Sequence, residues 1–342
     1  MNTERQFNEE EQQQSEDPQI LEKMIKPDLS KMYFWDINDS PKRIEISFPI
    51  PENFDDNLLS FNLSKHHNSI SVEMPSSPPI IKGELIDVVK SMDVSKVNGR
   101  FLITLQKQNQ GLWESVIVGP HSDSKDIDPQ SAFILGTEVT NSQNDQKKTF
   151  EYLHTSAFLG YIPAMCVLGR FMMTHTEFFK DGALLFSLAI EYYDSPEAMV
   201  EMGDVLASMP SMSHSALTLY ERALEKGHTN AHTSLGRFYS PLSSTKGSKN
   251  AKKAIYHFQE AGDNPIALHE LALMYFNGVG VRKDLRKANE LQLKAKEKNP
   301  HIKPLFKRKT PFSTKFLYFL LIILICIGLG YLLNIKIEKI RK

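Results

Sequence analysis

The chain has 342 residues, a formal net charge of −1 and a pI of about 6.8. This length allows two modest domains, and the balanced charge excludes the strongly basic composition of a general nucleic-acid-binding protein. Only two cysteines are present, Cys166 and Cys326, so a disulfide framework is excluded and folding in a reducing compartment such as the cytosol is expected.

The first segment, residues 1–28, is polar, acidic and rich in glutamine, with the run EEEQQQSED at residues 9–17. Such a composition buries too little apolar surface to offset the entropy that is lost on ordering, so we predict a disordered tail. The segment starts without an apolar run and therefore gives no sign of a secretory signal.

Residues 29–120 carry the alternation of polar and apolar side chains that is typical of β-strands. The alternation is clear in Arg43–Phe48 and Asn68–Met74, and a denser β-forming run follows at Phe101–Leu105. Prolines and the dipeptide Asn98-Gly99 punctuate these runs. Short strands separated by such turn signals predict a small antiparallel β-sandwich.

Short motifs stand in a fixed order within this block: Tyr33-Phe34-Trp35, Gly83-Glu84-Leu85, Leu105-Gln106-Lys107 and Trp113. From Tyr33 to Val118 this order resembles the CS domain, the module of nuclear-movement proteins and of chaperone cofactors. That family carries another tryptophan before its last long strand, and this chain has none between Ser91 and Val97. The resemblance implies a link to the heat-shock-protein-ninety chaperone or to nuclear-movement factors.

The two tryptophans of this block, Trp35 and Trp113, have two alternative roles. A sandwich this small needs the large area that an aromatic side chain buries, which favours core packing. The other role is contact with a protein partner. The next segment, residues 121–129, is polar (HSDSKDIDP) and is predicted to be a linker.

Residues 130–298 change to a helical period and repeat themselves. A hydrophobic residue followed by glycine recurs at steps of 33, 34 and 33 residues, and Leu271-Ala272 follows after 36. The recurring pairs are Leu135-Gly136, Leu168-Gly169, Met202-Gly203 and Leu235-Gly236. A repeat of this length predicts an α-solenoid of about five helix pairs of the tetratricopeptide kind.

The second helix of each later unit carries two small residues seven positions apart, which places both on one helical face. Small residues there let the two helices of a pair approach closely. The residues predicted to pack the repeats are Ala254, Ala261 and Ala288 of these second helices, together with Gly169, Gly203 and Gly236 of the recurring pairs.

The segment from Tyr275 to Ala288 reads YFNGVGVRKDLRKA and follows the pattern Y-x-x-G-x-G-V-x-x-D-x-x-K-A of the Sel-one-like repeat, which it closely resembles. Gly278 and Gly280 lie in its loop, where we predict a tight turn between two helices. A phosphate-binding loop would need a third glycine or a following Lys-Ser/Thr, which are missing. The resemblance implies assembly of a larger complex, often at the endoplasmic reticulum.

The C-terminal part joins a basic juxtamembrane segment, residues 299–315, to residues 316–335, a run of twenty without a charge. A helix of that length rises about 30 Å, the thickness of the hydrocarbon core, so we predict one transmembrane helix that anchors the chain in a lipid bilayer. A short basic tail, residues 336–342, follows. The remainder of the chain is then expected to face the cytosol as in a tail-anchored protein.

Two features of this anchor favour different membranes. Its long apolar run favours the endoplasmic reticulum or the nuclear envelope, which is our prediction. The basic tail favours the mitochondrial outer membrane, which stays as the alternative.

The fold class predicted from these segments is multidomain, with a CS-like sandwich, an α-solenoid and one transmembrane helix. No catalytic constellation, cofactor loop or metal-ligand motif is recognisable, so we expect no enzyme, no cofactor and no metal. We predict a co-chaperone-like, tail-anchored adaptor that recruits chaperone machinery or client proteins to a membrane and binds no nucleic acid. The alternative is a structural organiser at the nuclear envelope or mitochondrial surface without chaperone activity.

Overall fold

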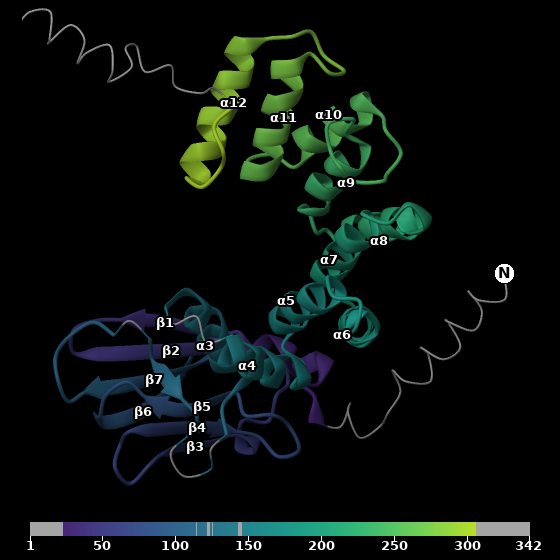
Figure 1. Cartoon of the computed structure of the whole chain (residues 1–342). Helices are drawn as coiled ribbons and strands as arrows, with labels where there is room; N and C mark the ends of the chain where they lie inside the picture. Colours follow the sequence, from purple (N-terminus) through teal and green to yellow (C-terminus); the bar gives the residue numbers. More distant parts are fainter. Residues whose placement is uncertain (1–22, 114, 122–123, 125, 143–145, 306–342) are drawn as a thin grey trace, which may run out of the picture. The chain divides into compact units, whose positions relative to one another are not determined.

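A computed structural model describes residues 23–113, 115–121, 124, 126–142 and 146–305. It divides into two compact units between Ala261 and Gly262. The first unit contains antiparallel sheets followed by helices, and the second contains one described helix pair (Figure 1). An antiparallel β part followed by a helical-repeat part confirms the predicted fold class at this level.

Two antiparallel sheets of four strands each make up the described sandwich, with the orders β1-β2-β7-β6 and β3-β4-β5-β8. The strands are β1 Asp36–Asp39, β2 Arg43–Pro49, β3 Ser60–Leu63, β4 Ser69–Glu73, β5 Ile81–Leu85, β6 Val89–Val97, β7 Arg100–Lys107 and β8 Ile117–Gly119. Alternate side chains of β2 and β7 point inward, and Phe101 of one sheet meets Phe61 of the other at 5.3 Å between ring centroids. The predicted alternation therefore fills the core between the sheets.

The hairpin between β6 and β7 turns at Asn98-Gly99, whose φ angles of 50° and 74° are both positive. Asparagine and glycine tolerate this backbone region, and a two-residue loop of this kind matches the twist of the paired strands. The loop sets the register that pairs Val97 with Arg100. Strand β6 itself lies at a sheet edge and is mostly exposed, which explains its weak signal in the sequence.

The predicted disordered tail, residues 1–28, is wrong at its described end. Met24 and Ile25 are buried. The backbone N–H of Ile25 donates to the carbonyl of Leu159 at 3.0 Å, and the Tyr193 hydroxyl donates to the carbonyl of Ile25 at 2.8 Å. Two apolar side chains thus hold this strap against the helices, a local feature that the average composition of the segment conceals. Residues 1–22 lie outside the described part.

The described end of the predicted linker 121–129 is packed as well. Ile127 and Asp128 are buried. The Asp128 carboxylate accepts the backbone N–H groups of Lys82 at 3.0 Å and Ser131 at 2.8 Å, and the Asp128 N–H donates to the carbonyl of Lys82 at 3.0 Å. The segment is therefore bound to β5 and caps the first helix, because a carboxylate satisfies the free N–H groups of a helix start.

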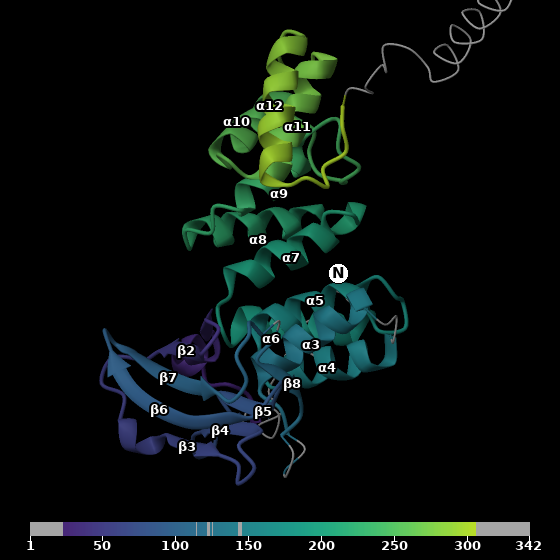
Figure 2. The same cartoon turned by 90° about the vertical axis from the view of Figure 1, so that its left-hand side faces the viewer.

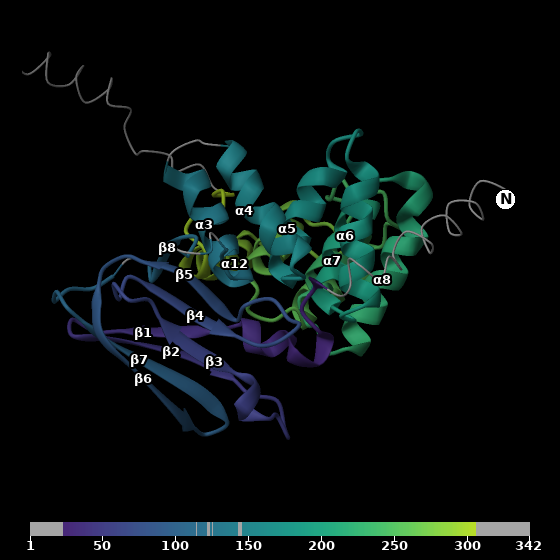
Figure 3. The same cartoon turned by 90° about the horizontal axis from the view of Figure 1, so that it is seen from below.

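The described helices are α3 Pro129–Ser142, α4 Gln146–Phe158, α5 Ile162–Met173, α6 Phe179–Glu191, α7 Pro196–Leu206, α8 Ser213–Glu225, α9 Ala231–Tyr239, α10 Ala251–Glu260, α11 Pro265–Asn277 and α12 Leu285–Lys298. Short 3₁₀ helices are η1 Pro27–Tyr33, η2 Asp56–Leu58 and η3 Pro210–Met212. Consecutive helices pack as pairs, with α11 and α12 forming the pair of the second unit. Helix α3 lies beside β5 and β8 of the sandwich (Figures 2 and 3).

Glycines of the first helices face large side chains of the second helices within the first unit. A Cβ on Gly169 would lie 3.1 Å from the Phe186 ring, and one on Gly203 would lie 2.6 Å from the Tyr220 ring. Gly236 stands against the Phe258 ring in the same way. Hydrogen in place of a side chain therefore lets each helix pair close.

The remaining residues predicted to pack the repeats fall at several kinds of position. Ala254 and Ala288 are fully buried, whereas Ala261 follows the last residue of α10 and is partly exposed. Gly278 has φ 74° and ends α11 in the left-handed conformation, and Gly280 has the same φ. Glycine is favoured at both because a Cβ is strained there.

Within the described residues no helix is both long and apolar enough to cross a bilayer. The predicted transmembrane run 316–335 and the basic tail 336–342 lie outside the described residues, as does the predicted juxtamembrane segment beyond residue 305.

Candidate protein-interaction surface

An apolar groove opens on the helices that follow the sandwich. Helix α4 contributes Phe150, His154 and Phe158, which are spaced at i, i+4 and i+8 and so form one stripe along the helix. Phe178 stands at the start of α6 and completes the aromatic rim. The three phenylalanines are 40%, 45% and 46% exposed in chain order, which is high for such large apolar side chains.

The floor of the groove comes from α5, α6 and the N-terminal strap. Its lining residues include Met24, Met172, Leu184, Leu185 and Leu188. The enclosed space is about 210 Å³, below the range of 300–1,000 Å³ that is usual for small-molecule pockets. A space of this size suits a single large apolar side chain of a partner.

The aromatic stripe of α4 is held in place by ring contacts. His154 stacks on Phe158 with 4.2 Å between centroids and lies 5.7 Å from Phe150. Burial lowers the pKa of His154, so the imidazole is neutral at pH 7 and adds no charge to the groove. The lining is therefore mostly apolar, with Asp181 as its one acidic residue.

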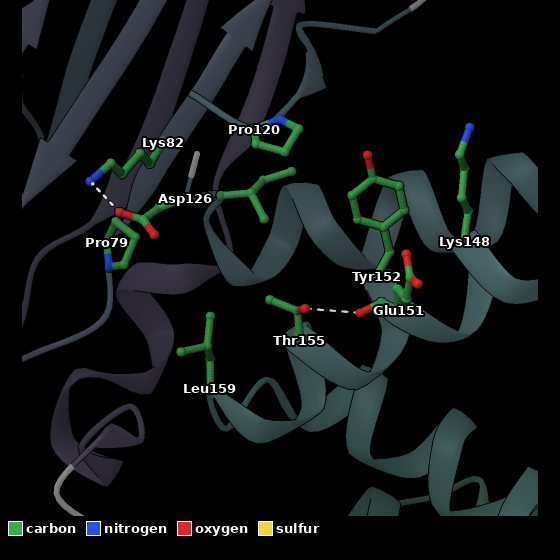
Figure 4. A pocket seen from close by; sticks show the side chains of 10 residues that line it. Pro79, Lys82, Pro120, Asp126, Lys148, Glu151, Tyr152, Thr155 and Leu159 are labelled. Carbon is green, nitrogen blue, oxygen red and sulfur yellow. Dashed lines mark hydrogen bonds and ion pairs between the residues drawn. The ribbon is translucent and has the colours of Figure 1, made fainter. Parts of the chain in front are cut away.

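A second cavity, of about 490 Å³, lies between the sandwich and α4 (Figure 4). Its polar lining residues are Lys82, Asp126, Lys148, Glu151, Tyr152 and Thr155. Lys82 and Asp126 face each other across its edge, and the Thr155 hydroxyl donates to the backbone carbonyl of Glu151 (Figure 4). This lining contains no histidine, cysteine or serine.

Lys82 contributes an amine, a group that can act as a base or nucleophile when deprotonated, to the lining of that cavity. Burial lowers its pKa, but ion pairs with Glu73 at 2.8 Å and Asp126 at 3.3 Å raise it, and the net shift is upward. The amine therefore stays protonated at neutral pH and is unsuited to act as a base or nucleophile. Its ion pairs join β5 to the segment that leads into α3.

A single described thiol, Cys166 of α5, is buried, and burial raises its pKa to about 12. A thiol that stays protonated is a poor nucleophile and a poor metal ligand. Among the described residues, no group of three or more His, Cys, Asp or Glu side chains is arranged to hold a metal ion.

The junction between sandwich and helices uses Trp35 in its backbone as well as its side chain. The Gln130 side-chain amide accepts the backbone N–H of Trp35 at 3.0 Å and donates to the backbone carbonyl of Trp35 at 2.8 Å. The indole is 4% exposed, so it packs in the core and offers no surface to a partner. This corrects the partner-binding alternative for Trp35.

Beside Trp35, Asp128 carries a carboxylate that is removed from solvent. Desolvation raises the pKa of Asp128 to about 6, although hydrogen bonds from Lys82 and Ser131 lower it. The Trp35 indole also lowers it, yet no hydrogen bond of normal geometry satisfies the indole N–H. The buried charge is therefore held by backbone N–H groups, which makes this junction sensitive to its geometry.

Trp113 lies in the loop before β8 and is partly exposed. Its ring covers the ammonium group of Lys107 at 5.0 Å, and Lys107 pairs with Asp39 at 2.5 Å. The backbone N–H of Trp113 also donates to the Asp39 carboxylate at 2.7 Å. Of Trp35 and Trp113, the two tryptophans considered for partner binding, only Trp113 is partly exposed and accessible to a partner.

A pair of histidines joins α9 to α10. The Nδ1 atoms of His232 and His257 lie 3.0 Å apart, and His257 stacks on Tyr239 with an interplanar angle of 7°. Burial, then the nearby His232 and Lys253, lower the pKa of His257 to about 4. His257 is therefore neutral at pH 7 in the folded chain.

The groove was not predicted from the sequence. None of its lining residues was predicted as a site. The spacing of Phe150, His154 and Phe158 is the signal that could have found the α4 stripe, because three aromatic rings at i, i+4 and i+8 on a helix with many polar residues stand out. The contributions of Phe178 and Met24 come from segments distant in sequence and carry no such signal.

Comparison with known proteins identifies two Sel1 repeats in the chain, at residues 230–264 and 265–300. These cover α9 to α12 and confirm the helical-repeat prediction for that part. No curated protein matches the chain. The Sel1 repeats support a role in protein–protein interaction.

Solved structures with a similar chain path include two Sel1 proteins. The Sel1 repeat protein of Oxalobacter formigenes has 19% identity and a TM-score of 0.41, over 52% of this chain and 73% of that chain. A putative Sel1 repeat protein of Klebsiella pneumoniae has 19% identity and a TM-score of 0.36, over 50% of this chain and 89% of that chain. The nuclear movement protein of E. cuniculi has 19% identity and a TM-score of 0.22, over 25% of this chain and 98% of that chain.

Proposed function

We propose that this protein is a non-catalytic adaptor that binds other proteins, and that the groove of α4 to α6 is one of its contact surfaces. The observation that carries the proposal is the ring of exposed phenylalanines around an apolar groove. Contiguous exposed apolar surface of this kind marks interaction sites in proteins. The two Sel1 repeats support the same function.

The chemistry of the groove favours a helical or extended segment with a large apolar anchor. Phe158 and Phe178 would flank such an anchor, while Leu185 and Met172 would form its seat. Anchors of this type contribute most of the binding energy of an interface, because they fill a desolvated pocket.

The partner class proposed here is chaperone machinery or its client proteins. The support is the CS resemblance of Tyr33 to Val118 together with the antiparallel sandwich that forms there. The alternative is a structural organiser that uses the same surfaces without a chaperone. Recovery of a heat-shock-protein-ninety chaperone with the purified protein separates the two, since only the first function requires it.

We further propose that residues 316–335 anchor the protein in the endoplasmic reticulum or nuclear envelope, with the described units in the cytosol. The support is the twenty-residue run without charge. Fusion of residues 300–342 to a fluorescent protein tests the membrane. A mitochondrial pattern that turns reticular when Lys336, Lys339, Arg341 and Lys342 become serine would favour the mitochondrial alternative.

The adaptor function is tested by affinity purification of the full-length protein from detergent extracts. Phe158→Asp places a charge in the groove and should reduce partner recovery strongly, since loss of an anchor of this type costs about 2 kcal/mol or more. Phe171→Asp is the matched control, because Phe171 is 53% exposed on α5 but does not line the groove. Equal recovery with both variants would contradict the assignment of the groove.

A further inference from the structure

The last described helix, α12, exposes an apolar stripe on a polar background. Leu285, Asn289, Leu293 and Lys296 are spaced at i, i+4, i+8 and i+11, so they follow one side of the helix. Leu285 is 49% exposed and Leu293 is 60% exposed. The buried side of α12, which packs against α11, is formed by Ala288, Leu291, Gln292 and Ala295.

Positive charge surrounds this stripe. Between Arg282 and Lys303 the chain carries eight Lys and Arg residues and three Asp and Glu residues. Arg286 and Lys296 flank Leu293, and neither forms an ion pair among the described residues. At 100° per residue, Glu297 lies about 40° and Glu290 about 60° from Leu293, so both acidic residues border the stripe on one side. Glu290 is paired with Lys287 at 3.5 Å and with Lys294 at 3.7 Å.

The residues that follow α12 fold back along the helix. The Gln292 amide donates to the carbonyl of Lys303 at 3.1 Å, which holds the residues after α12 against the middle of the helix. Ten residues, 306–315, separate the described chain from the uncharged run 316–335. Even fully extended, they reach at most about 40 Å, so an inserted run keeps the end of the described chain within that distance of the bilayer.

From this placement we propose that the stripe of α12, formed by Leu285, Arg286, Leu293 and Lys296, docks on the headgroups of an anionic lipid surface. The inference rests on the proposed membrane anchor. Leucines at such a surface bury apolar area, and each basic residue near it strengthens binding about fivefold. The terminal repeat would then lie on the membrane instead of pointing away from it.

The test uses the full-length protein reconstituted into vesicles of phosphatidylcholine, with or without phosphatidylserine. An environment-sensitive dye is attached to Leu293→Cys in a background in which Cys166 and Cys326 are alanine. We expect brighter, blue-shifted emission in the phosphatidylserine vesicles, reversed by high salt. Ile266→Cys on α11 is the matched control, because Ile266 is 47% exposed in the same unit but lies off the stripe, and its dye should not respond.

Charge reversal by Arg286→Glu and Lys296→Glu should abolish the response of the Leu293 dye. A response that survives this reversal, or emission that is equal in the two vesicle types, would overturn the proposal. The second outcome would leave the stripe as a candidate face for a protein partner.

Vesicle flotation separates this inference from the anchor on which it rests. Flotation with phosphatidylcholine alone reports insertion of the uncharged run, whatever the stripe does. Flotation only with phosphatidylserine vesicles, abolished by Arg286→Glu and Lys296→Glu, would refute the anchor and still support the stripe. Flotation with neither composition would refute both.

Discussion

The sandwich–helix junction and the contacts within the helix pairs hold the same chain together by different chemistry. At the junction, the Trp35 backbone pairs with the Gln130 amide, and the buried Asp128 carboxylate accepts two backbone N–H groups. Within the pairs, a glycine such as Gly203 or Gly236 faces a large aromatic ring. The first kind of contact is polar and unique, whereas the second is apolar and periodic.

This difference determines how each region responds to change. A solenoid contact is repeated, so damage to one pair spreads to its neighbours and leaves the rest of the array able to form. A polar junction depends on each partner, because an unsatisfied buried group costs more than the hydrogen bond contributes. Loss of one polar partner at the junction should therefore cause a large drop in the free energy of unfolding. Damage to one helix pair should cause a smaller drop, because the other pairs still form.

The largest effect is expected from Trp35→Ala, which removes a buried indole next to the junction. Replacement of a core tryptophan by alanine costs about 3–5 kcal/mol of unfolding free energy. Trp113→Ala should cost less, because Trp113 is partly exposed. Thermal melting of both variants measures the difference, and equal destabilisation would mean that the Trp35 pocket collapses around the vacancy.

Gly236→Leu should disrupt the helix pair of α9 and α10, since a side chain there would enter the space of the Phe258 ring. Overpacking of this kind costs about 1–3 kcal/mol. Gly119→Ala is the control, because a Cβ on Gly119 meets nothing within 4 Å. Unchanged melting and helicity of Gly236→Leu would refute the repeat register.

Gln130→Ala leaves the N–H and carbonyl of Trp35 without their partner and should destabilise the junction. A loss of about 1–3 kcal/mol is expected from the unsatisfied backbone groups. Gln108→Ala is the matched control at an exposed glutamine and should change stability by at most about 0.5 kcal/mol. Denaturant melts of the two variants compare them, and indistinguishable midpoints would show that water replaces the Gln130 amide.

The smallest effect near neutral pH is expected from the histidine pair of α9 and α10. The pKa of His257 is lowered to about 4, below its usual value, so the unfolded chain binds protons more readily. The stability that neutral His257 contributes is fully present above pH 6.5 and is lost as pH falls toward 4. His257→Phe keeps a ring against Tyr239 and should lose less stability over this window than the wild type.

Comparing the stability of the wild type with that of His257→Phe at each pH isolates the contribution of His257, because Asp128 is present in both proteins. The buried Asp128 works in the opposite direction: its pKa is raised to about 6, so lowering the pH relieves a buried charge. Parallel melting curves for wild type and His257→Phe between pH 7 and pH 4 would contradict the assignment to His257.

The sequence predicted most where its pattern was local. The alternation of Arg43–Phe48 gave β2, and Asn98-Gly99 gave the turn of the β6–β7 hairpin, since two positive φ angles need such residues. Gly278 gave the end of α11 for the same reason. These signals depend on a few neighbouring residues and need no knowledge of the rest of the chain.

The sequence pattern reveals part of the groove of α4 to α6 but does not reveal the stripe of α12. Phe150, His154 and Phe158 share one helix, so their spacing was visible, but Phe178 and Met24 reach them only through folding. The exposed leucines of α12 looked like any helical pattern until the structure showed which side packs on α11.

By itself, the sequence determined the antiparallel strands, the helical period and the Sel1 repeats of residues 230–300. Only the tertiary structure decided that the ends of the predicted tail and linker are ordered, and that Trp35 is enclosed while Trp113 is not. The physical reason is the range of the forces involved. Backbone propensity and periodic burial act over a few residues, whereas the Asp128 and Gln130 contacts join groups 46 and 95 positions apart and exist only once the chain has folded.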